Sequence, residues 1–227
     1  MIGKTNAKNY YIYKLIEEVP KEFQVVEYLE SDGLSYIDTE VLSHSNMCAE
    51  LQFEFTEIPN DGGIIGTKYS GKNRERLYFY HYFQGPKLGY GNYFGSEFNT
   101  QIGETYHVKT RLDVGNQYMY INENLIYQGQ NTTYINTRLN FYIFNLNTAG
   151  KEDGKYFTKA KLYFCKIWDN DDLIRYFIPV YRIEDNIPGL YDIINQKFYI
   201  NQGTGNFLLG ENSEFNLELF NSSKIEF

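Results

Sequence analysis

The stretch MCAELQFEF, residues 47–55, alternates apolar with polar side chains at every position except Cys48. Its odd-numbered positions hold Met, Ala, Leu, Phe and Phe, and its even-numbered positions hold Cys, Glu, Gln and Glu. Successive side chains of a β-strand point to opposite faces of a sheet, so this period of two is typical of a strand with one buried and one solvated face. The stretch therefore predicts a strand whose core side carries Met47, Leu51 and Phe53.

The same period of two continues along most of the chain, and convincing helical periodicity is almost absent. Residues 105–113 repeat the pattern, with Tyr106, Val108 and Leu112 expected to point inward. Hairpins are expected at three places: residues 117–129 turning at Glu123, 161–180 turning at Asn170-Asp171, and 191–200 turning at Asn195-Gln196. Gly- and Asn-rich turns are expected at residues 60–63, 85–92 and 147–155. The predicted class is all-β, as a sandwich or a barrel.

The bulk composition excludes several functions. The 227 residues include 29 Asp and Glu against 21 Lys and Arg, a net charge of -8 that argues against a nucleic-acid binder or an anionic-membrane binder. The opening residues lack the apolar core of a secretory signal, and no apolar run is long enough for membrane insertion. Cys48 and Cys165 fall in predicted strands, so we expect two buried thiols rather than a disulfide.

A tyrosine-rich strand raises the question of a binding surface. LYFYHYF, residues 77–83, places three tyrosines on one face and apolar residues with His81 on the other. The tyrosine face is either more core, a partner interface, or a platform for stacking a sugar ring. Polar partners for a sugar lie nearby in Gln84 and in the stretch that follows, so the candidate ligand-binding residues are Tyr78, Tyr80, Tyr82, Tyr90, Asn92 and Tyr93. His81 is expected to be a hydrogen-bonded core residue.

No internal repeat or low-complexity linker divides the chain. We predict one domain over residues 23–210, an N-terminal arm or attachment segment over 1–22, and a C-terminal tail over 211–227. Both ends carry apolar residues, which favours docking on a neighbouring subunit, with packing back on the same domain as the alternative.

Two blocks of sequence resemble a known module. FQVVEYLESDGLSYIDTEV (23–41) and the block at 160–207, which contains IPVYR, GLYD and FYINQGTGNF, are similar to the opening and closing of a concanavalin A-like, laminin G-like module. That module is common in phage structural proteins and in gut-bacterial proteins. The chain departs from it at Asp32, where Thr is usual, at Glu40, where Gly is usual, and at Val180, where Cys is usual.

The resemblance implies an antiparallel jelly-roll sandwich of two sheets. The fold hosts lectins, glycan hydrolases and packing modules, so function depends on the site. Its hydrolases deliver paired carboxylates in runs such as E-x-D-x-E, and no such run occurs here. The nearest stretch, residues 30–35, is better interpreted as a turn at Asp32-Gly33. No catalytic residues and no enzyme activity are expected.

An acidic cluster is a weak metal candidate. Asp169, Asp171 and Asp172 lie at a hairpin tip, and oxygen ligands in loops are how lectin-like domains hold Ca²⁺. The alternative is that Asn and Asp simply form the turn. We therefore expect no cofactor, with Ca²⁺ as the exception to test.

The sequence thus predicts a non-enzymatic structural protein of a phage virion, made in the bacterial cytoplasm without a signal peptide. A decoration, fibre or tail-associated place is expected, with attachment to other virion proteins through the termini, homo-oligomeric copies, and adhesion to a cell-surface or mucosal glycan. The alternative functions are a lectin-like carbohydrate-binding module and a glycan hydrolase of the same fold.

Overall fold

The computed structural model describes residues 19–68, 76–82, 85–91, 98–149, 151–152 and 156–212, with only the backbone for Tyr80, Tyr82, Lys151 and Glu152. Every regular element in these ranges is a β-strand, which confirms the predicted all-β class. Within them there is no helix of the length and apolarity needed to cross a membrane.

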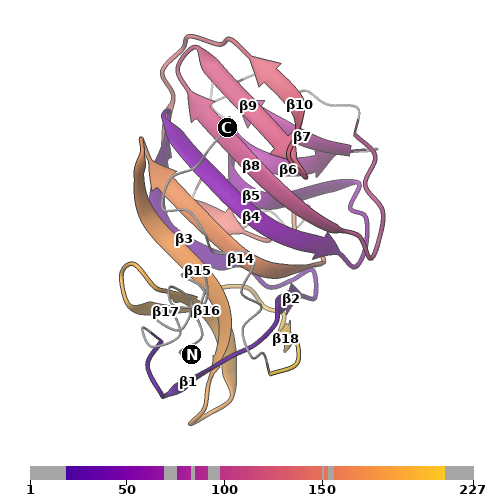
Figure 1. Cartoon of the computed structure of the whole chain (residues 1–227), viewed down its shortest axis with the longest axis vertical. Coiled ribbons are helices and arrows are strands. Elements are labelled where there is room, and N and C mark those ends of the chain that lie inside the picture. The colour runs from indigo at the N-terminus through magenta and orange to yellow at the C-terminus, as the bar shows by residue number, and fades with distance from the viewer. Residues whose placement is uncertain are drawn as a thin grey trace, which may run out of the picture.

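The larger of two sheets has eleven strands, of which β10, β9, β8, β4, β14 and β15 lie side by side in Figure 1. The path continues through β16 to β17, while β1 pairs with β15, β2 with β14, and β18 with β2. All of these pairs are antiparallel. The bounds are β1 Phe23–Val25, β2 Leu29–Ser31, β4 Met47–Phe55, β8 Thr105–Asp113, β9 Asn116–Ile121, β10 Asn124–Gly129, β14 Ala160–Asp169, β15 Asp172–Arg182, β16 Ile187–Asp192, β17 Lys197–Ile200 and β18 Phe207–Leu209.

The second sheet has seven strands in the order β13, β12, β5, β11, β3, with β6 on β5 and β7 on β6. Its pairs are antiparallel except for β12 with β5, which is parallel. The bounds are β3 Ile37–His44, β5 Asp61–Lys68, β6 Arg76–Tyr82, β7 Gly85–Tyr90, β11 Asn136–Ile143, β12 Asn147–Thr148 and β13 Lys151–Glu152.

The core lies between the two sheets. Met47, Leu51, Phe53 and Phe55 of β4 are buried as the alternation predicted. Phe53 contacts Phe79 of the opposite sheet at a ring-centroid distance of 5.8 Å. Contacts of this kind bury the inward faces of both sheets, which is the main stabilising term of a sandwich.

The hairpin predictions are confirmed. β9 and β10, β14 and β15, and β16 and β17 pair as antiparallel hairpins at the expected places. Their turns place Asn122, Glu123, Asn170 and Gln196 at positive φ, between 50° and 63°. Asn tolerates this left-handed region better than most residues, which is why Asn-containing turns could be located from sequence.

The expectation of turns at residues 60–63 and 85–92 is wrong for most of both stretches, because Asp61–Gly63 belongs to β5 and Gly85–Tyr90 is strand β7. The glycines serve close packing instead of a turn. A Cβ atom on Gly89 would lie 2.2 Å from the ring of Tyr78, and one on Gly85 would lie 2.1 Å from the carbonyl oxygen of Phe98. A strand glycine often marks such a close approach.

The two blocks that carry the family resemblance meet in space. Asp32 Oδ1 accepts hydrogen bonds from the Leu34 amide at 2.9 Å and the Ser35 hydroxyl at 3.1 Å, and Oδ2 accepts from the Asn206 amide at 2.7 Å. Asn201 Oδ1 in turn accepts from the Tyr36 amide at 3.1 Å. Hydrogen bonds between residues 32–36 and 201–206 therefore join the start of the domain to its end; we call them the Asp32 clamp. Asp32-Gly33 forms a turn, as predicted.

The division of the chain into arm, domain and tail stays a prediction, since residues 1–18 and 213–227 lie outside the described residues. Pairing does continue slightly beyond the expected boundary at 210. Glu27 donates its amide to the carbonyl of Glu211, and Val26 forms a bridge with Asn212.

The two cysteines are free and buried, as expected. Burial raises the pKa of the Cys48 thiol to about 12, although Arg111 opposes the shift. Burial also raises the pKa of Cys165, which is 0% exposed. Neither thiol is ionised at neutral pH, so both behave as small apolar side chains.

Candidate functional site

The tyrosines predicted to stack on a sugar do not form one exposed face. Tyr78 is 2% exposed and packs with Leu146 and Tyr156, while its ring lies over Gly89. Burial raises the pKa of its hydroxyl despite the nearby charge of Arg76. Tyr78 therefore lies in the interior, and its ring offers no surface to a ligand.

Tyr90 is 1% exposed and acts as a structural hydrogen-bonding residue. Its hydroxyl donates to the carbonyl of Thr133 at 2.8 Å and lies 2.6 Å from the hydroxyl of Ser45. The side chains of Tyr80 and Tyr82, and all of Gln84, Asn92 and Tyr93, lie outside the described residues, so their proposed ligand contacts stay predictions.

His81 is a core residue, as predicted. It is 1% exposed, and its ring nitrogens lie 2.8 Å from the Pro59 carbonyl oxygen and 2.8 Å from the Thr100 hydroxyl. Burial lowers its pKa, so it is neutral near physiological pH. With both nitrogens engaged, His81 is not free to serve a ligand.

An open hollow lies at the end of β10. Its volume is about 750 Å³, and the described residues that line it are Tyr127, Gln128, Gly129, Gln130, Asn131 and Thr132. We call it the 127–132 hollow. It follows the edge strand of the eleven-stranded sheet and continues into the connection that leads to β11.

A buried amide holds this segment in place. Gln117 of β9 is 1% exposed; its Nε2 donates to the Asn131 carbonyl at 2.8 Å and also to the Asp113 carbonyl. Its Oε1 accepts from the Asn131 amide at 2.8 Å. Gly115 also donates its amide to the Asn131 carbonyl, at 2.8 Å. Asn131 is therefore fixed to the β8–β9 hairpin by backbone as well as side-chain bonds.

A second buried network fixes the residues that follow. Ser45 is 0% exposed; its hydroxyl accepts from the Ile135 amide at 2.8 Å, and its amide donates to the Ile135 carbonyl at 2.7 Å. Tyr90 joins Ser45 to Thr133, as described above. The backbone of the loop between β10 and β11 is thus anchored at Asn131, Thr133 and Ile135, which limits the freedom of the loop before a ligand binds.

The exposed groups of this loop are polar and aromatic. Gln128, Gln130 and Thr132 are exposed, and Tyr134, two residues beyond the hollow, is 58% exposed. Amides offer both donors and acceptors, as sugar hydroxyls do, and tyrosine rings can pack on the apolar face of a sugar. The arrangement can therefore hold a hydroxyl-rich ligand.

Sequence reasoning missed this site. The signal was the run YQGQNTTY at 127–134, in which two tyrosines enclose amides and hydroxyls. Its sequence pattern does not differ from that of a solvated loop. Only the structure shows that Gln117, Ser45 and Tyr90, which are buried, form hydrogen bonds with the backbone of this loop.

A charged group lies on the outer face of β4, where Glu50, Gln52 and Glu54 take successive outward positions. The face was expected to be solvated, yet Glu50 is only 7% exposed, and its carboxylate is paired with two basic side chains. His107 Nε2 lies 2.7 Å from its Oε1, and Lys166 Nζ lies 3.4 Å from its Oε2. The arrangement resembles E-x-D-x-E with an amide in the middle, a set that the sequence reasoning passed over.

The ionisation of Glu50 does not suit proton donation. Burial raises its pKa, but the hydrogen bond from His107 and the charge of Lys166 outweigh burial and hold the pKa below its usual value. Glu54 is likewise engaged, with Lys161 Nζ 2.8 Å from its Oε1. A general acid working near neutral pH needs a raised pKa, which is the opposite of what this pairing produces.

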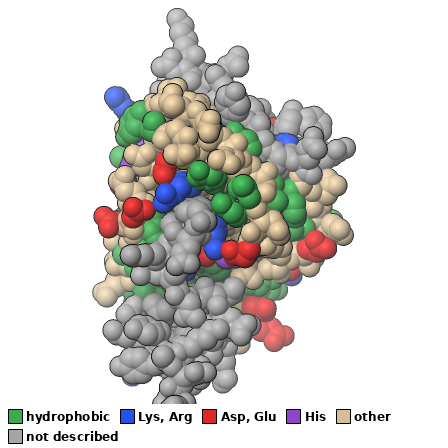
Figure 2. Space-filling model, turned by 45° about the horizontal axis from the view of Figure 1, so that its top comes forward, with side chains coloured by type: hydrophobic (Ala, Val, Ile, Leu, Met, Phe, Trp, Pro, Cys, Tyr) green, Lys and Arg blue, Asp and Glu red, His purple; other side chains and the backbone are tan. Residues whose placement is uncertain are grey.

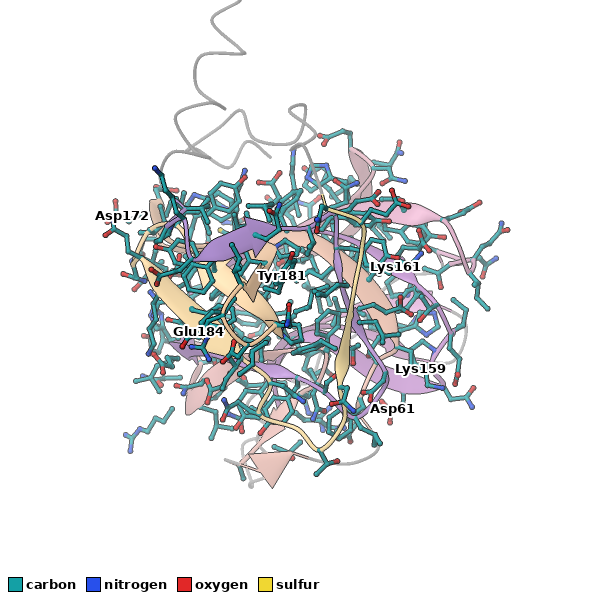
Figure 3. All side chains as sticks on the ribbon, turned by 90° about the horizontal axis from the view of Figure 1, so that it is seen from below. Asp61, Lys159, Lys161, Asp172, Tyr181 and Glu184 are labelled. Atoms are coloured by element: carbon teal, nitrogen blue, oxygen red, sulfur yellow. The ribbon has the colours of Figure 1, made fainter. Side chains whose placement is uncertain are left out.

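The candidate calcium ligands do not converge. Asp169 Oδ2 lies 3.4 Å from His44 Nε2, and Asp171 Oδ1 lies 3.2 Å from a guanidinium nitrogen of Arg111. Figure 3 places Asp172 at the periphery of the molecule, on the side away from Asp61 and Lys159. In the ranges that the structure describes, no group of three or more His, Cys, Asp or Glu side chains could hold a metal ion.

Comparison with known proteins identifies the fold. No protein-family model and no curated protein sequence matches the chain. A candidate carbohydrate-binding protein from Bacteroides ovatus superposes with a TM-score of 0.56 at 13% identity, over 83% of this chain and 61% of that protein. A heptameric SAP-like pentraxin from Limulus polyphemus superposes with a TM-score of 0.50 at 9% identity, over 86% of this chain and 98% of the pentraxin. The chain has a concanavalin A-like jelly-roll fold.

The predicted architecture is thereby confirmed. Domains LG4-5 of the mouse laminin alpha1 chain are similar at a TM-score of 0.47 and 10% identity, over 63% of this chain and 42% of theirs. This chain spans 61% of the length of the Bacteroides protein, so the whole activity of that protein is not implied here. At such low identities the likeness establishes the jelly-roll fold alone.

Proposed function

We propose that the chain is a carbohydrate-binding module that holds a glycan in the 127–132 hollow. The hollow carries this proposal, because its amide, hydroxyl and tyrosine side chains match the groups that bind and orient sugars. The likeness to a candidate carbohydrate-binding protein of the same fold supports it.

Binding without hydrolysis is the second part of the proposal. The carboxylates on the outer face of β4 are paired with cations, and the pKa of Glu50 is lowered. This pairing favours a structural role for Glu50 and Glu54. Release of reducing ends from any glycan, abolished by Glu50→Gln, would overturn this part.

The biological setting proposed is the surface of a phage particle. The resemblance of residues 23–41 and 160–207 to a module common in phage structural proteins supports a virion protein attached through its termini. Several copies on one particle would turn a weak single-site affinity into firm adhesion, which favours a homo-oligomer. Mass photometry of the purified chain and immunogold labelling of released particles test these two points, and a monomer or unlabelled particles would contradict them.

A glycan array probed with the purified, multimerised chain tests the binding role. Wild type should bind a subset of glycans, and Gln130→Ala should weaken that binding by about tenfold, the loss of one or two hydrogen bonds. Gln202→Ala is the matched control, since Gln202 is exposed outside the hollow. Equal binding by both variants would place the glycan elsewhere, and no binding by wild type would refute the function.

A further inference from the structure

The described residues that line the 127–132 hollow carry no charge. Its six described residues are one tyrosine, three amides, a glycine and a threonine. Figure 2 brings forward the end of the molecule that carries β9 and β10, and the described surface there is mostly tan and green, with a few Lys, Arg, Asp and Glu side chains. The chemistry of the site is therefore that of hydroxyl and amide recognition.

An acidic sugar needs a cation, and carboxylates and sulfates are bound in proteins by Arg or Lys. Arg111 belongs to the hairpin that anchors the hollow, yet its guanidinium lies 3.2 Å from Asp113 Oδ2 and 3.2 Å from Asp171 Oδ1. Two carboxylates thus neutralise this cation. The net charge of -8 adds a long-range repulsion against anionic ligands.

The exposed side chains suit a neutral ligand in their chemistry. The amides of Gln128 and Gln130 can each donate and accept, which matches pairs of sugar hydroxyls or an acetamido group. The buried Gln117 fixes the backbone of the neighbouring Asn131, which lowers the cost of ordering this segment when a ligand binds.

From this lining we infer that the hollow selects neutral glycans, built from hexoses or N-acetylhexosamines, and discriminates against sialylated, uronic and sulfated ones. This inference rests on the proposed glycan-binding function and names its ligand class. Recognition runs through amides, hydroxyls and tyrosine rings of this chain, without a charged contact.

Isothermal titration with matched glycan pairs tests the inference. The pairs are N-acetyllactosamine with its 3′-sialylated form, and methyl-esterified oligogalacturonate with the free acid, alongside neutral cello- and chito-oligosaccharides. The expected result is a neutral ligand that binds at least about tenfold tighter than the acidic forms. Its affinity should change by less than about twofold between low and high salt, because no ion pair is screened.

A charge substitution sharpens the design. Gln130→Lys should gain affinity for the acidic member of a pair by about fivefold and make that binding salt-dependent, whereas Gln202→Lys should not. Acidic glycans bound tightly by wild type, with loss in Gln130→Ala, would overturn the neutral-ligand inference while keeping the glycan function. No glycan bound by wild type at millimolar concentration would overturn both.

Discussion

Replacing Gln117 by Leu should destabilise the fold and loosen the binding site together. The change keeps the side-chain volume but removes three hydrogen bonds, two donated to the Asp113 and Asn131 carbonyls and one accepted from the Asn131 amide. The Asn131 carbonyl keeps its bond from Gly115, whereas the Asn131 amide loses its partner. At about 0.5–1.5 kcal/mol for each of the three bonds, the loss is about 2–4 kcal/mol.

Urea unfolding followed by intrinsic fluorescence measures this loss. The variant should show an unchanged m-value and a lower urea midpoint. In a thermal scan its melting temperature should fall by roughly 4–16 °C, at about 2–4 °C per kcal/mol for a chain of this length. Glycan affinity should weaken by about tenfold although Gln117 touches no ligand, because Asn131 is no longer held. Gln128→Ala is the control and should change stability by less than about 0.5 kcal/mol, as exposed substitutions do. A Gln117→Leu protein as stable as this control would refute the reasoning.

Three further predictions concern the frame of the fold. Asp32→Ala should cost about 1–2 kcal/mol at pH 7, when three donors lose an ionised acceptor. Burial raises the pKa of Asp32 in the folded protein, but hydrogen bonds from Asn206, Leu34 and Ser35 outweigh burial and lower this pKa. The extra stability of wild type over Asp32→Ala is therefore present above the ordinary pKa of 3.8 and is lost as pH falls through the lower folded pKa. Urea unfolding that shows the same stability difference at pH 7 and at about pH 2.5 would contradict this. Asp192→Ala should cost about 3–5 kcal/mol in denaturant unfolding, because Asp192 is 0% exposed and accepts from the Tyr176 and Ile194 amides and from Asn195. Asp185→Ala, at an exposed carboxylate, is the control and should leave the unfolding midpoint almost unchanged. Cys48 and Cys165 should resist a thiol reagent in the native protein and both react in guanidinium; rapid native labelling would show that their burial is incomplete.

Strand positions could be predicted because they follow from local physics. Residues 47–55 and 105–113 follow a period of two with few exceptions, and β4 and β8 begin and end at those residues. Two of the three predicted hairpin turns lie where Asn adopts positive φ, at Asn122 and Asn170. The clamp between Asp32 and Asn206 could not be foreseen, since its partners are far apart in sequence, although both lie in the blocks that carry the family resemblance.

The departure at Glu40 has a structural meaning. The family usually has Gly there, and Glu40 adopts a φ of 57°, a left-handed conformation that glycine enters without strain. Its carboxylate pairs with Lys197 at 2.5 Å, and its amide donates to Asp38 Oδ1 at 2.8 Å. These contacts offset the strain of a side chain at this position.

The proposed binding site was harder to predict, because distant segments decide which residues on the second face of a strand are buried. The period of two predicts that Tyr78 and Phe79 point to opposite faces of the strand. Tyr78 is nevertheless interior, because Leu146 and Tyr156 pack against it. Tyr90 is interior because Ser45 and Thr133 hold its hydroxyl. Conversely, Gln128 and Gln130 carry no local signal that separates a fixed loop from a solvated one.

The most direct test of the account is the mapping of amide chemical shifts on titration with a neutral oligosaccharide that the chain binds. The account predicts shifts concentrated in residues 127–134, with Gln128, Gln130 and Thr132 among the largest and saturation at the affinity found by calorimetry. Shifts that leave this segment unmoved and gather on another face would contradict it.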